Sequence, residues 1–238
     1  VTPGQPLSGF QVLVLAFAVL ISAGSAGAFN QYFEVDLDSL MQRTRNRPFV
    51  TGRFHKSPLW VLFIMLLLVA GVASAALVLN GAAAFYIFLG AFFYAVIYTV
   101  WLKRRTWMNI VIGGASGSFA VLAGAAAVDT AMSPVPVLLA LVLFFWTPSH
   151  FWSLAIAKHQ DYANAGVPML PVVIGDSRTA VVVMVNTLIL VGISVLPFFY
   201  GLSWLYLVAA LSGGGYFIYC NYLMILDPSA KIAMKSFF

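Results

Sequence analysis

Long apolar runs alternate with short polar stretches along the whole chain. Seven runs approach the roughly 20 apolar residues that an α-helix needs to cross a bilayer, and no linker interrupts the series. The pattern therefore predicts an all-α fold, a multi-pass transmembrane helix bundle forming a single domain over residues 1–238. The expected spans are approximately residues 10–29, 58–79, 83–101, 109–128, 136–157, 179–200 and 203–222.

The composition is also that of a membrane protein. Hydrophobic residues make up 62% of the chain and charged residues only 8%, whereas a soluble domain carries about 25% charged residues. The net charge of +5 would suit a nucleic-acid partner, but the many apolar spans exclude a nucleic-acid binder in practice. The one cysteine, Cys220, lies in an expected span and excludes an internal disulfide.

The basic residues all fall on one side of the expected membrane. The twelve Lys and Arg follow the first, third, fifth and seventh spans, and the loops near 80–82, 129–135 and 201–202 have none. Cytoplasmic loops of membrane proteins carry an excess of Lys and Arg, so this side is expected to face the cytoplasm or its equivalent. The opening stretch VTPGQPLSG is expected to be a loop, without the basic region of a signal peptide.

Charge is concentrated in the stretch GAFNQYFEVDLDSLMQRTRNRPFVTGR, residues 27–53, which holds three of the seven acidic residues. If the first helix continues through it, Asn30, Glu34 and Asp38 lie four residues apart on one face. Asp36 lies on another face, and joins them only if the helix breaks or another partner intervenes. We therefore expect one amide and two carboxylates to point together from the end of the first span.

Two interpretations account for these carboxylates. A charge at the bilayer centre costs about 3 kcal/mol on insertion scales, so something must offset it. The first interpretation is ion pairing with Arg43 and Arg47. The second is a divalent cation, because Mg²⁺ takes a few carboxylate oxygens and completes its coordination with water and substrate phosphates. The arginines would then bind a phosphate, which they can do with two parallel hydrogen bonds.

Two further polar stretches lie on the same side. The stretch YTVWLKRRTWMN, residues 98–109, is by itself typical of a positive-inside anchor with interfacial aromatic residues. The loop at 158–178 contains Lys158 and Asp161, whose spacing also fits a plain ion pair within a helix. Together the three segments predict a polar mouth that binds a magnesium diphosphate, with an apolar tail running down between helices.

Three blocks carry a resemblance to a known family. NQYFEVDLDSLMQRTRNRP, YTVWLKRRTWMNIVIGGASGSF and WTPSHFWSLAIAKHQDYANAGVPMLPVV, in this order, resemble the protoheme IX farnesyltransferases, or haem O synthases. That family belongs to the UbiA superfamily of intramembrane prenyltransferases, and the resemblance covers nearly the whole chain. It implies Mg²⁺-dependent transfer of a farnesyl group from farnesyl diphosphate to a vinyl group of haem B, giving haem O and diphosphate. The downstream haem A synthase or a terminal oxidase is an implied partner.

The resemblance also implies roles for individual residues. The implied metal ligands are Asn30, Glu34, Asp38 and Asp161, and these four with Lys103 form the implied catalytic set. The implied diphosphate contacts are Arg43, Arg47, Lys103, Arg104 and Lys158. As imidazole suits iron, His150 and His159 are candidate haem contacts. The plainer alternatives are that His150 makes a hydrogen bond within the bundle and that His159 is solvated.

The chain departs from the family pattern in several places. Glu34 stands where the superfamily often has Asp, and Asp161 has Ala157 and Ala165 four residues to either side, where a paired aspartate would stand. A second, symmetric Mg²⁺ site is therefore left open. The family has nine helices, so the chain is expected to lack the first helix and to be cut within the last part. The GVPMLPVV form favours a bacterial cytoplasmic membrane over a mitochondrial inner membrane.

Two other functions compete with this one. A prenyltransferase that acts on a quinone precursor or another aromatic acceptor would use the same donor site. An ion or solute transporter would explain carboxylates in a helix bundle. The acids cluster on one side, however, and ionisable residues are nearly absent from the middle of the spans, so no relay crosses the membrane.

Overall fold

The structure, a computed structural model, describes residues 6–237, and every regular element within that range is helical. Residues 1–5 of the expected opening loop and Phe238 lie outside the described residues. Within the described range, seven helices are long and apolar enough to cross a membrane, which confirms the predicted spans. They are Gly9–Phe33, Pro58–Val78, Gly81–Leu102, Asn109–Val128, Pro134–Ala157, Asp176–Phe199 and Trp204–Leu226.

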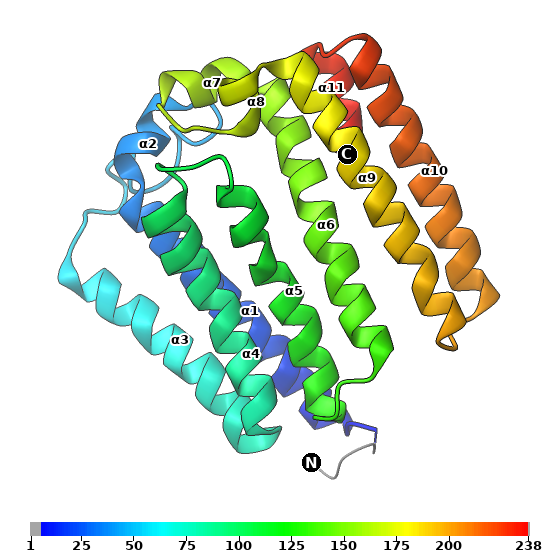
Figure 1. The fold of residues 1–238 in the computed structure, drawn as a ribbon. Coiled ribbons are helices and arrows are strands. Elements are labelled where there is room, and N and C mark those ends of the chain that lie inside the picture. Colours follow the sequence, from blue (N-terminus) through cyan, green and yellow to red (C-terminus); the bar gives the residue numbers. More distant parts are fainter. Residues whose placement is uncertain (1–5, 238) are drawn as a thin grey trace. The chain divides into compact units, whose positions relative to one another are not determined.

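Figure 1 labels these helices and the short ones between them. The long helices are α1 (Gly9–Phe33), α3 (Pro58–Val78), α4 (Gly81–Phe92) with its π-helical continuation η1 (Phe93–Leu102), α5 (Asn109–Val128), α6 (Pro134–Ala157), α9 (Asp176–Phe199) and α10 (Trp204–Leu226). The short helices are α2 (Val35–Leu40), α7 (His159–Asn164), α8 (Leu170–Ile174) and α11 (Ala230–Phe237). All four short helices lie in polar stretches or just after the last span, and none was assigned separately from the sequence.

The chain divides into two compact units. The first unit comprises the chain through Trp101 together with Ala115–Pro136, and the second comprises Leu102–Gly114 and the chain from Val137 onward. The first unit therefore contains α1 to α4 and most of α5. The second contains most of α6 and all of α7 to α11.

Small side chains bring the helices of the first unit close together. A Cβ atom added at Gly71 of α3 would come within 2.3 Å of Ser22 Oγ and 3.0 Å of the Ala18 carbonyl oxygen, both on α1. Ala18, Ala75, Ala83 and neighbouring apolar residues form one buried core. Close approach through small residues is how helices pack in lipid, where burial of apolar surface gives little drive. Gly71 and Ala75, in the GVASAA segment of α3, serve this packing.

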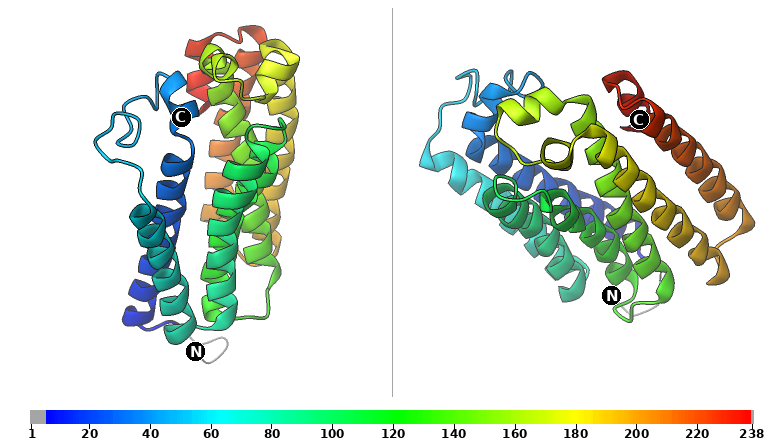
Figure 2. Two further views of the ribbon diagram at one scale, coloured as in Figure 1. Left: turned by 90° about the vertical axis from the view of Figure 1, so that its left-hand side faces the viewer. Right: turned by 45° about the horizontal axis from the view of Figure 1, so that its top comes forward.

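Hydroxyl and amide groups connect the helices of the second unit. Ser149 of α6 and Thr187 of α9 share a hydrogen bond of 2.9 Å, and Asn221 of α10 donates to Thr187 Oγ1 at 2.7 Å. Ser236 of α11 donates to Asn221 Oδ1. Figure 2 shows α9 and α10 side by side as an antiparallel pair with α11 following α10. Buried polar contacts of this kind hold transmembrane helices in register.

Candidate functional site

The end of the first span is bent at Glu34. This residue has φ −96° and ψ 22°, outside the α-helical range, and it separates α1 from α2. The i to i−4 hydrogen bonds nevertheless continue across it, from Glu34 N to the Asn30 carbonyl at 2.9 Å and from Asp38 N to the Glu34 carbonyl at 2.8 Å. Asn30, Glu34 and Asp38 therefore share one side, as predicted, although the helix is not continuous.

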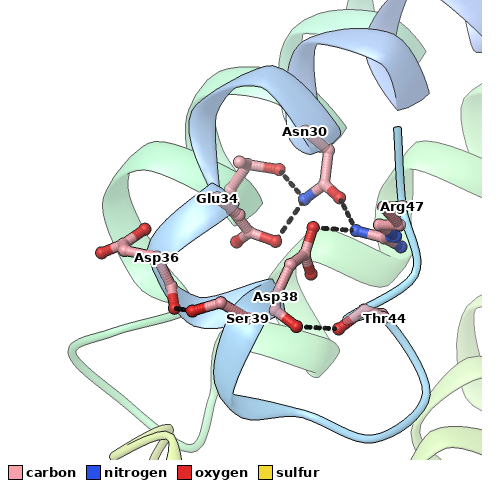
Figure 3. A network of polar contacts seen from close by, with 8 residues as sticks. Asn30, Glu34, Asp36, Asp38, Ser39, Thr44 and Arg47 are labelled. Atoms are coloured by element: carbon pink, nitrogen blue, oxygen red, sulfur yellow. Dashed lines mark hydrogen bonds and ion pairs between the residues drawn. The ribbon is translucent and has the colours of Figure 1, made fainter. Parts of the chain in front are cut away.

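These three residues and Arg47 form what we call the acid cluster (Figure 3). Asn30 Nδ2 donates to Glu34 Oε2 at 2.7 Å, and Arg47 Nη1 donates to Asn30 Oδ1 at 3.2 Å and to Asp38 Oδ2 at 2.6 Å. Asn30, Glu34 and Asp38 are 3%, 0% and 1% exposed. Thr44 Oγ1 donates to the Asp38 carbonyl at 3.1 Å and so ties the loop that carries Arg47 to α2.

The Arg47–Asp38 contact bears out the ion-pair interpretation for one of the carboxylates. A buried carboxylate is tolerated when a charged partner and hydrogen bonds replace its water. The oxygen atoms of the cluster also fit a divalent cation, because Mg²⁺ prefers carboxylate and amide oxygens. Within residues 6–237 no group of three or more His, Cys, Asp or Glu is placed to hold a metal. A cation here would need the Asn30 amide and phosphate oxygens besides Glu34 and Asp38.

Asp36 and Arg43 of the first polar stretch are exposed, unlike the members of the acid cluster. Asp36 is exposed, and its carbonyl accepts a hydrogen bond from Ser39 Oγ at 2.7 Å, as Figure 3 shows. Arg43 is also exposed, in a stretch of turns rather than in a helix. The sequence placed Asp36 on another face, and the structure agrees. Arg43 makes neither of the hydrogen bonds that Arg47 makes with Asn30 and Asp38.

The π-helical segment η1 is a feature that the sequence analysis missed. Thr99, which is fully buried, accepts a hydrogen bond from Asn30 Nδ2 at 3.1 Å and donates to the Tyr94 carbonyl, five residues back, at 2.8 Å. π-Helical turns are rare and recur at functional sites. The signal in the sequence was a single threonine near the end of the apolar run FYAVIYTVWL, which hydrophobicity alone does not distinguish.

An apolar cavity of about 310 Å³ lies next to the acid cluster, within the first unit. Its lining reaches Gly27, three residues before Asn30, and Tyr94, whose carbonyl binds Thr99. The rest of the lining is mostly small or apolar, from α1, α4 and α5: Val19, Ser22, Ala23, Ala26, Tyr86, Ile87, Gly90, Ala91, Ser116, Gly117 and Ala120. The cavity can therefore accept a hydrocarbon chain whose polar end meets the acid cluster.

In the second unit, the basic turn between η1 and α5 is held by Asn109. This buried residue donates from Nδ2 to the Thr106 carbonyl at 2.6 Å and to the Lys103 carbonyl at 3.4 Å. Lys103 is only 8% exposed, whereas Arg104 is exposed. A buried lysine is unusual, which distinguishes Lys103 from an ordinary interfacial anchor.

The loop at 158–178, which we call the second polar stretch, begins like the first: one non-helical residue separates a long helix from a short one. Lys158, with φ −120° and ψ 30°, separates α6 from α7, and Asp161 lies in the first turn of α7. Both side chains are half-buried, and their roles as metal ligand and diphosphate contact stay predictions, with the plain ion pair as the alternative. The buried side chain of this short helix is Tyr162.

The two candidate haem contacts have different surroundings. The ring of His150 is stacked between those of Trp146, at a centroid distance of 4.2 Å, and Phe237, at 4.0 Å. Both faces of this imidazole are therefore covered, and the ring also makes a hydrogen bond with the backbone of Phe237, which bears out the plainer alternative of a hydrogen bond within the bundle. His159 Nδ1 lies 2.7 Å from Asp176 Oδ1, and both side chains are about one-third exposed. His159 is thus not simply solvated but makes a partly exposed hydrogen bond with Asp176.

Several named proteins are similar to this chain over most of its length. Protoheme IX farnesyltransferase 2 of Paramagnetospirillum magneticum is 55% identical over 237 residues, covering 100% of this chain and 82% of that protein. A protoheme IX farnesyltransferase of Alkalilimnicola ehrlichii is 42% identical and covers 99% of this chain and 78% of its own length.

The fold is shared with solved structures of UbiA homologues. A UbiA homologue from Archaeoglobus fulgidus, bound to DMAPP and Mg²⁺, matches 96% of this chain and 84% of that one with a TM-score of 0.76, at 18% identity. The model of the UbiA prenyltransferase family matches residues 1–238. With the close relatives above, this match identifies the chain as a multi-pass integral membrane protein and an enzyme of the UbiA prenyltransferase family.

Proposed function

We propose that the protein transfers a farnesyl group from farnesyl diphosphate to a vinyl group of haem B, giving haem O and diphosphate. Relatives up to 55% identical are named for this reaction. The observation that carries the proposal is an apolar cavity whose lining includes Gly27, one helical turn before the buried Asn30, and Tyr94, whose carbonyl accepts from Thr99 beside the acid cluster. This arrangement suits a substrate with a charged diphosphate and a long hydrocarbon tail.

The acid cluster would hold Mg²⁺ through oxygen atoms of Asn30, Glu34 and Asp38. When bound, this cation would neutralise charge on the diphosphate leaving group, which is often a large contribution to catalysis. A UbiA homologue of the same fold has been solved with Mg²⁺ and DMAPP bound. We propose Asp161 as a ligand from the second polar stretch, on the resemblance alone, and leave a second ion open.

The cationic side chains would bind and orient the diphosphate. Arg47 already holds Asp38 and Asn30 through a single nitrogen, Nη1, and a guanidinium has further N–H groups for a phosphate. Lys103, which is almost fully buried, would add positive charge where little water screens it. We propose Arg43, Arg104 and Lys158 as further diphosphate contacts.

The apolar cavity would hold the farnesyl tail and keep water from the reacting carbon. Breaking the allylic C–O bond leaves positive charge on the prenyl group, and an aromatic ring face stabilises a cation by about 0.5–2 kcal/mol. Tyr86 and Tyr94 line the cavity and are the candidates for this contact. The haem vinyl group would then attack the prenyl carbon, and water would add to the resulting haem-side cation to give the hydroxyl group.

The acceptor would be held by the second unit. His150 is the stronger haem candidate, because Trp146 and Phe237 fix its ring, and it would bind haem through the ring nitrogen that is not hydrogen-bonded to the Phe237 backbone. His159 is the weaker one, since Asp176 binds its Nδ1. The reaction would occur at the cytoplasmic face of a bacterial inner membrane, as the one-sided distribution of Lys and Arg suggests. Haem A synthase or a terminal oxidase would receive the product.

Membranes that contain the protein can test this function directly. They would be incubated with haem B, farnesyl diphosphate and Mg²⁺, and the extracted haems identified by mass. We expect haem O in the complete mixture and none when EDTA removes the Mg²⁺. A mixture in which haem B stays unmodified while an added quinone precursor is prenylated would contradict the proposed acceptor and keep the proposed donor site.

A further inference from the structure

The amide of Asn30 has only one orientation that its neighbours permit. The amide nitrogen Nδ2 of Asn30 lies 2.7 Å from Glu34 Oε2 and donates to it. The guanidinium of Arg47 donates and cannot accept, so the atom 3.2 Å from Nη1 is the amide oxygen Oδ1. Oδ1 therefore lies on the side of Arg47 and Nδ2 on the side of Glu34.

Thr99 takes the second hydrogen of this amide nitrogen. Its Oγ1 lies 3.1 Å from Asn30 Nδ2 and 2.8 Å from the Tyr94 carbonyl. A hydroxyl has one hydrogen, and a carbonyl can only accept, so Thr99 donates to Tyr94 and accepts from Asn30. The hydroxyl is fully buried, so this direction is enforced without water.

The π-helical backbone explains why a threonine at this position can accept a hydrogen bond from Asn30. The bond from Thr99 Oγ1 to Tyr94 runs to the carbonyl five residues earlier, within η1. An α-helical segment would carry a threonine hydroxyl to the carbonyl three or four residues back. The wider turn thus sets the direction in which the Thr99 hydroxyl accepts, toward α1.

We propose that Thr99 is a positioning residue that fixes the Asn30 amide so that Oδ1 stays on the side of Arg47. A hard cation takes the oxygen end of an amide and not the nitrogen end. Without the Thr99 hydroxyl, one N–H group of a buried amide loses its partner, and rotation of the amide is no longer opposed on that side. This inference rests on the proposed function, because it assigns Thr99 to the Mg²⁺ and diphosphate site.

The test compares four forms of the purified protein in lipid nanodiscs. They are the wild type, Thr99→Val, Thr99→Ser and Thr187→Val. Thr187 is a matched control because it too is a fully buried threonine whose Oγ1 accepts from an asparagine, Asn221, at 2.7 Å. Calorimetry would measure binding of farnesyl thiodiphosphate, an unreactive analogue, over a range of Mg²⁺ concentrations.

For Thr99→Val, we expect the Mg²⁺ concentration that half-saturates analogue binding to rise about tenfold, the low end for loss of a group that orients a metal ligand. Thr99→Ser keeps the hydroxyl and should stay within about threefold of the wild type. Thr187→Val should leave this Mg²⁺ concentration unchanged even if it lowers thermal stability. If Thr99→Val does not fold, Thr99→Ala removes the same hydroxyl with less volume.

Two results would overturn the proposal. One is a shift for Thr99→Val, or for its alanine substitute, no larger than that for Thr187→Val. The other is a failure of Thr99→Ser to restore the Mg²⁺ dependence. A wild type that binds the analogue without any need for Mg²⁺ would instead contradict the proposed metal site, and so the two failures are distinguishable.

Discussion

The first and second polar stretches share a backbone arrangement but differ in how their charged side chains are placed. In each, a spanning helix stops at one residue outside the helical range, Glu34 or Lys158, and a helix of six residues follows. The first stretch then buries two carboxylates in a hydrogen-bonded cluster. In the second, the observed acid–base contact is between His159 and Asp176, whose side chains are 35% and 33% exposed.

The two stretches therefore differ in whether their charged groups are buried: Glu34 and Asp38 are buried, whereas His159 and Asp176 are partly exposed. The polar contact of His159 with Asp176 is partly exposed, so water can replace either partner and the contact places few demands on its surroundings. A buried carboxylate requires fixed partners. In the acid cluster, Asn30 of α1 is the partner of Glu34, and Arg47, in the turn after α2, is the partner of Asp38. Thr99 of η1 holds Asn30 in turn. We therefore assign the metal and diphosphate chemistry first to the acid cluster.

The largest expected effect is that of Asp38→Asn. The substitution keeps the shape but removes the charge that Arg47 and the cation would share, so haem O formation should fall about 100-fold or more. Initial rates in membranes, normalised to the amount of protein, would measure it. Asp129→Asn, in the loop between α5 and α6, is the matched control. A rate within threefold of the wild type for Asp38→Asn would remove the acid cluster from catalysis.

Arg47→Lys should have the next largest effect. Lysine keeps the charge but not the planar fork that lets one side chain hold Asp38 and a phosphate together, and we expect a loss of about tenfold in kcat/KM for farnesyl diphosphate. Arg53, which is exposed on the same polar stretch, provides the control Arg53→Lys. Equal effects at the two arginines would mean that general positive charge, and not the contacts of Arg47, matters.

Ala23→Phe should alter the preference for chain length. Ala23 lines the apolar cavity on α1, and a phenyl group there would occupy space that the tail needs. The ratio of rates with farnesyl and dimethylallyl diphosphate should fall about tenfold, since overpacking costs about 1–3 kcal/mol. Ala16→Phe, exposed on the same helix, should leave this ratio unchanged. An unchanged ratio for Ala23→Phe would place the tail elsewhere.

The smallest expected effect concerns the second unit. His150→Phe preserves an aromatic ring between Trp146 and Phe237 but removes both nitrogens. We expect thermal stability to be retained and haem binding, followed by the Soret band, to weaken several-fold. His55→Gln, at an exposed position, is the control. Unchanged haem binding in His150→Phe would show that the imidazole only packs.

The spans could be predicted from the sequence because they depend on length and apolar character alone. The predicted runs at 58–79 and 109–128 differ from α3 and α5 by at most one residue at either end. The π-helical part of the third span could not be predicted, because no periodicity distinguishes ten apolar and aromatic residues in a π-helix from the same residues in an α-helix. Hydrophobicity reports that a segment is inserted, not how its backbone winds.

The contacts of the acid cluster could be predicted where the two residues are close in the sequence, and not where they are far apart in it. Spacing of four residues placed Asn30, Glu34 and Asp38 on one side, and that placement survives the bend at Glu34. Thr99 lies 69 residues from Asn30 in the chain, so their contact depends on how α4 and η1 pack against α1. Arg47 was singled out with Arg43, but only the folding of the turn determines which of them reaches Asp38.

The most direct test of the central claim is mass analysis of haem from membranes given haem B, farnesyl diphosphate and Mg²⁺, with the wild type and Asp38→Asn side by side. We expect haem O from the wild type only when Mg²⁺ is present, and almost none from the variant. Equal amounts of haem O from both proteins would contradict the role of the acid cluster. An absence of any prenylated product from the wild type would contradict the proposed reaction itself.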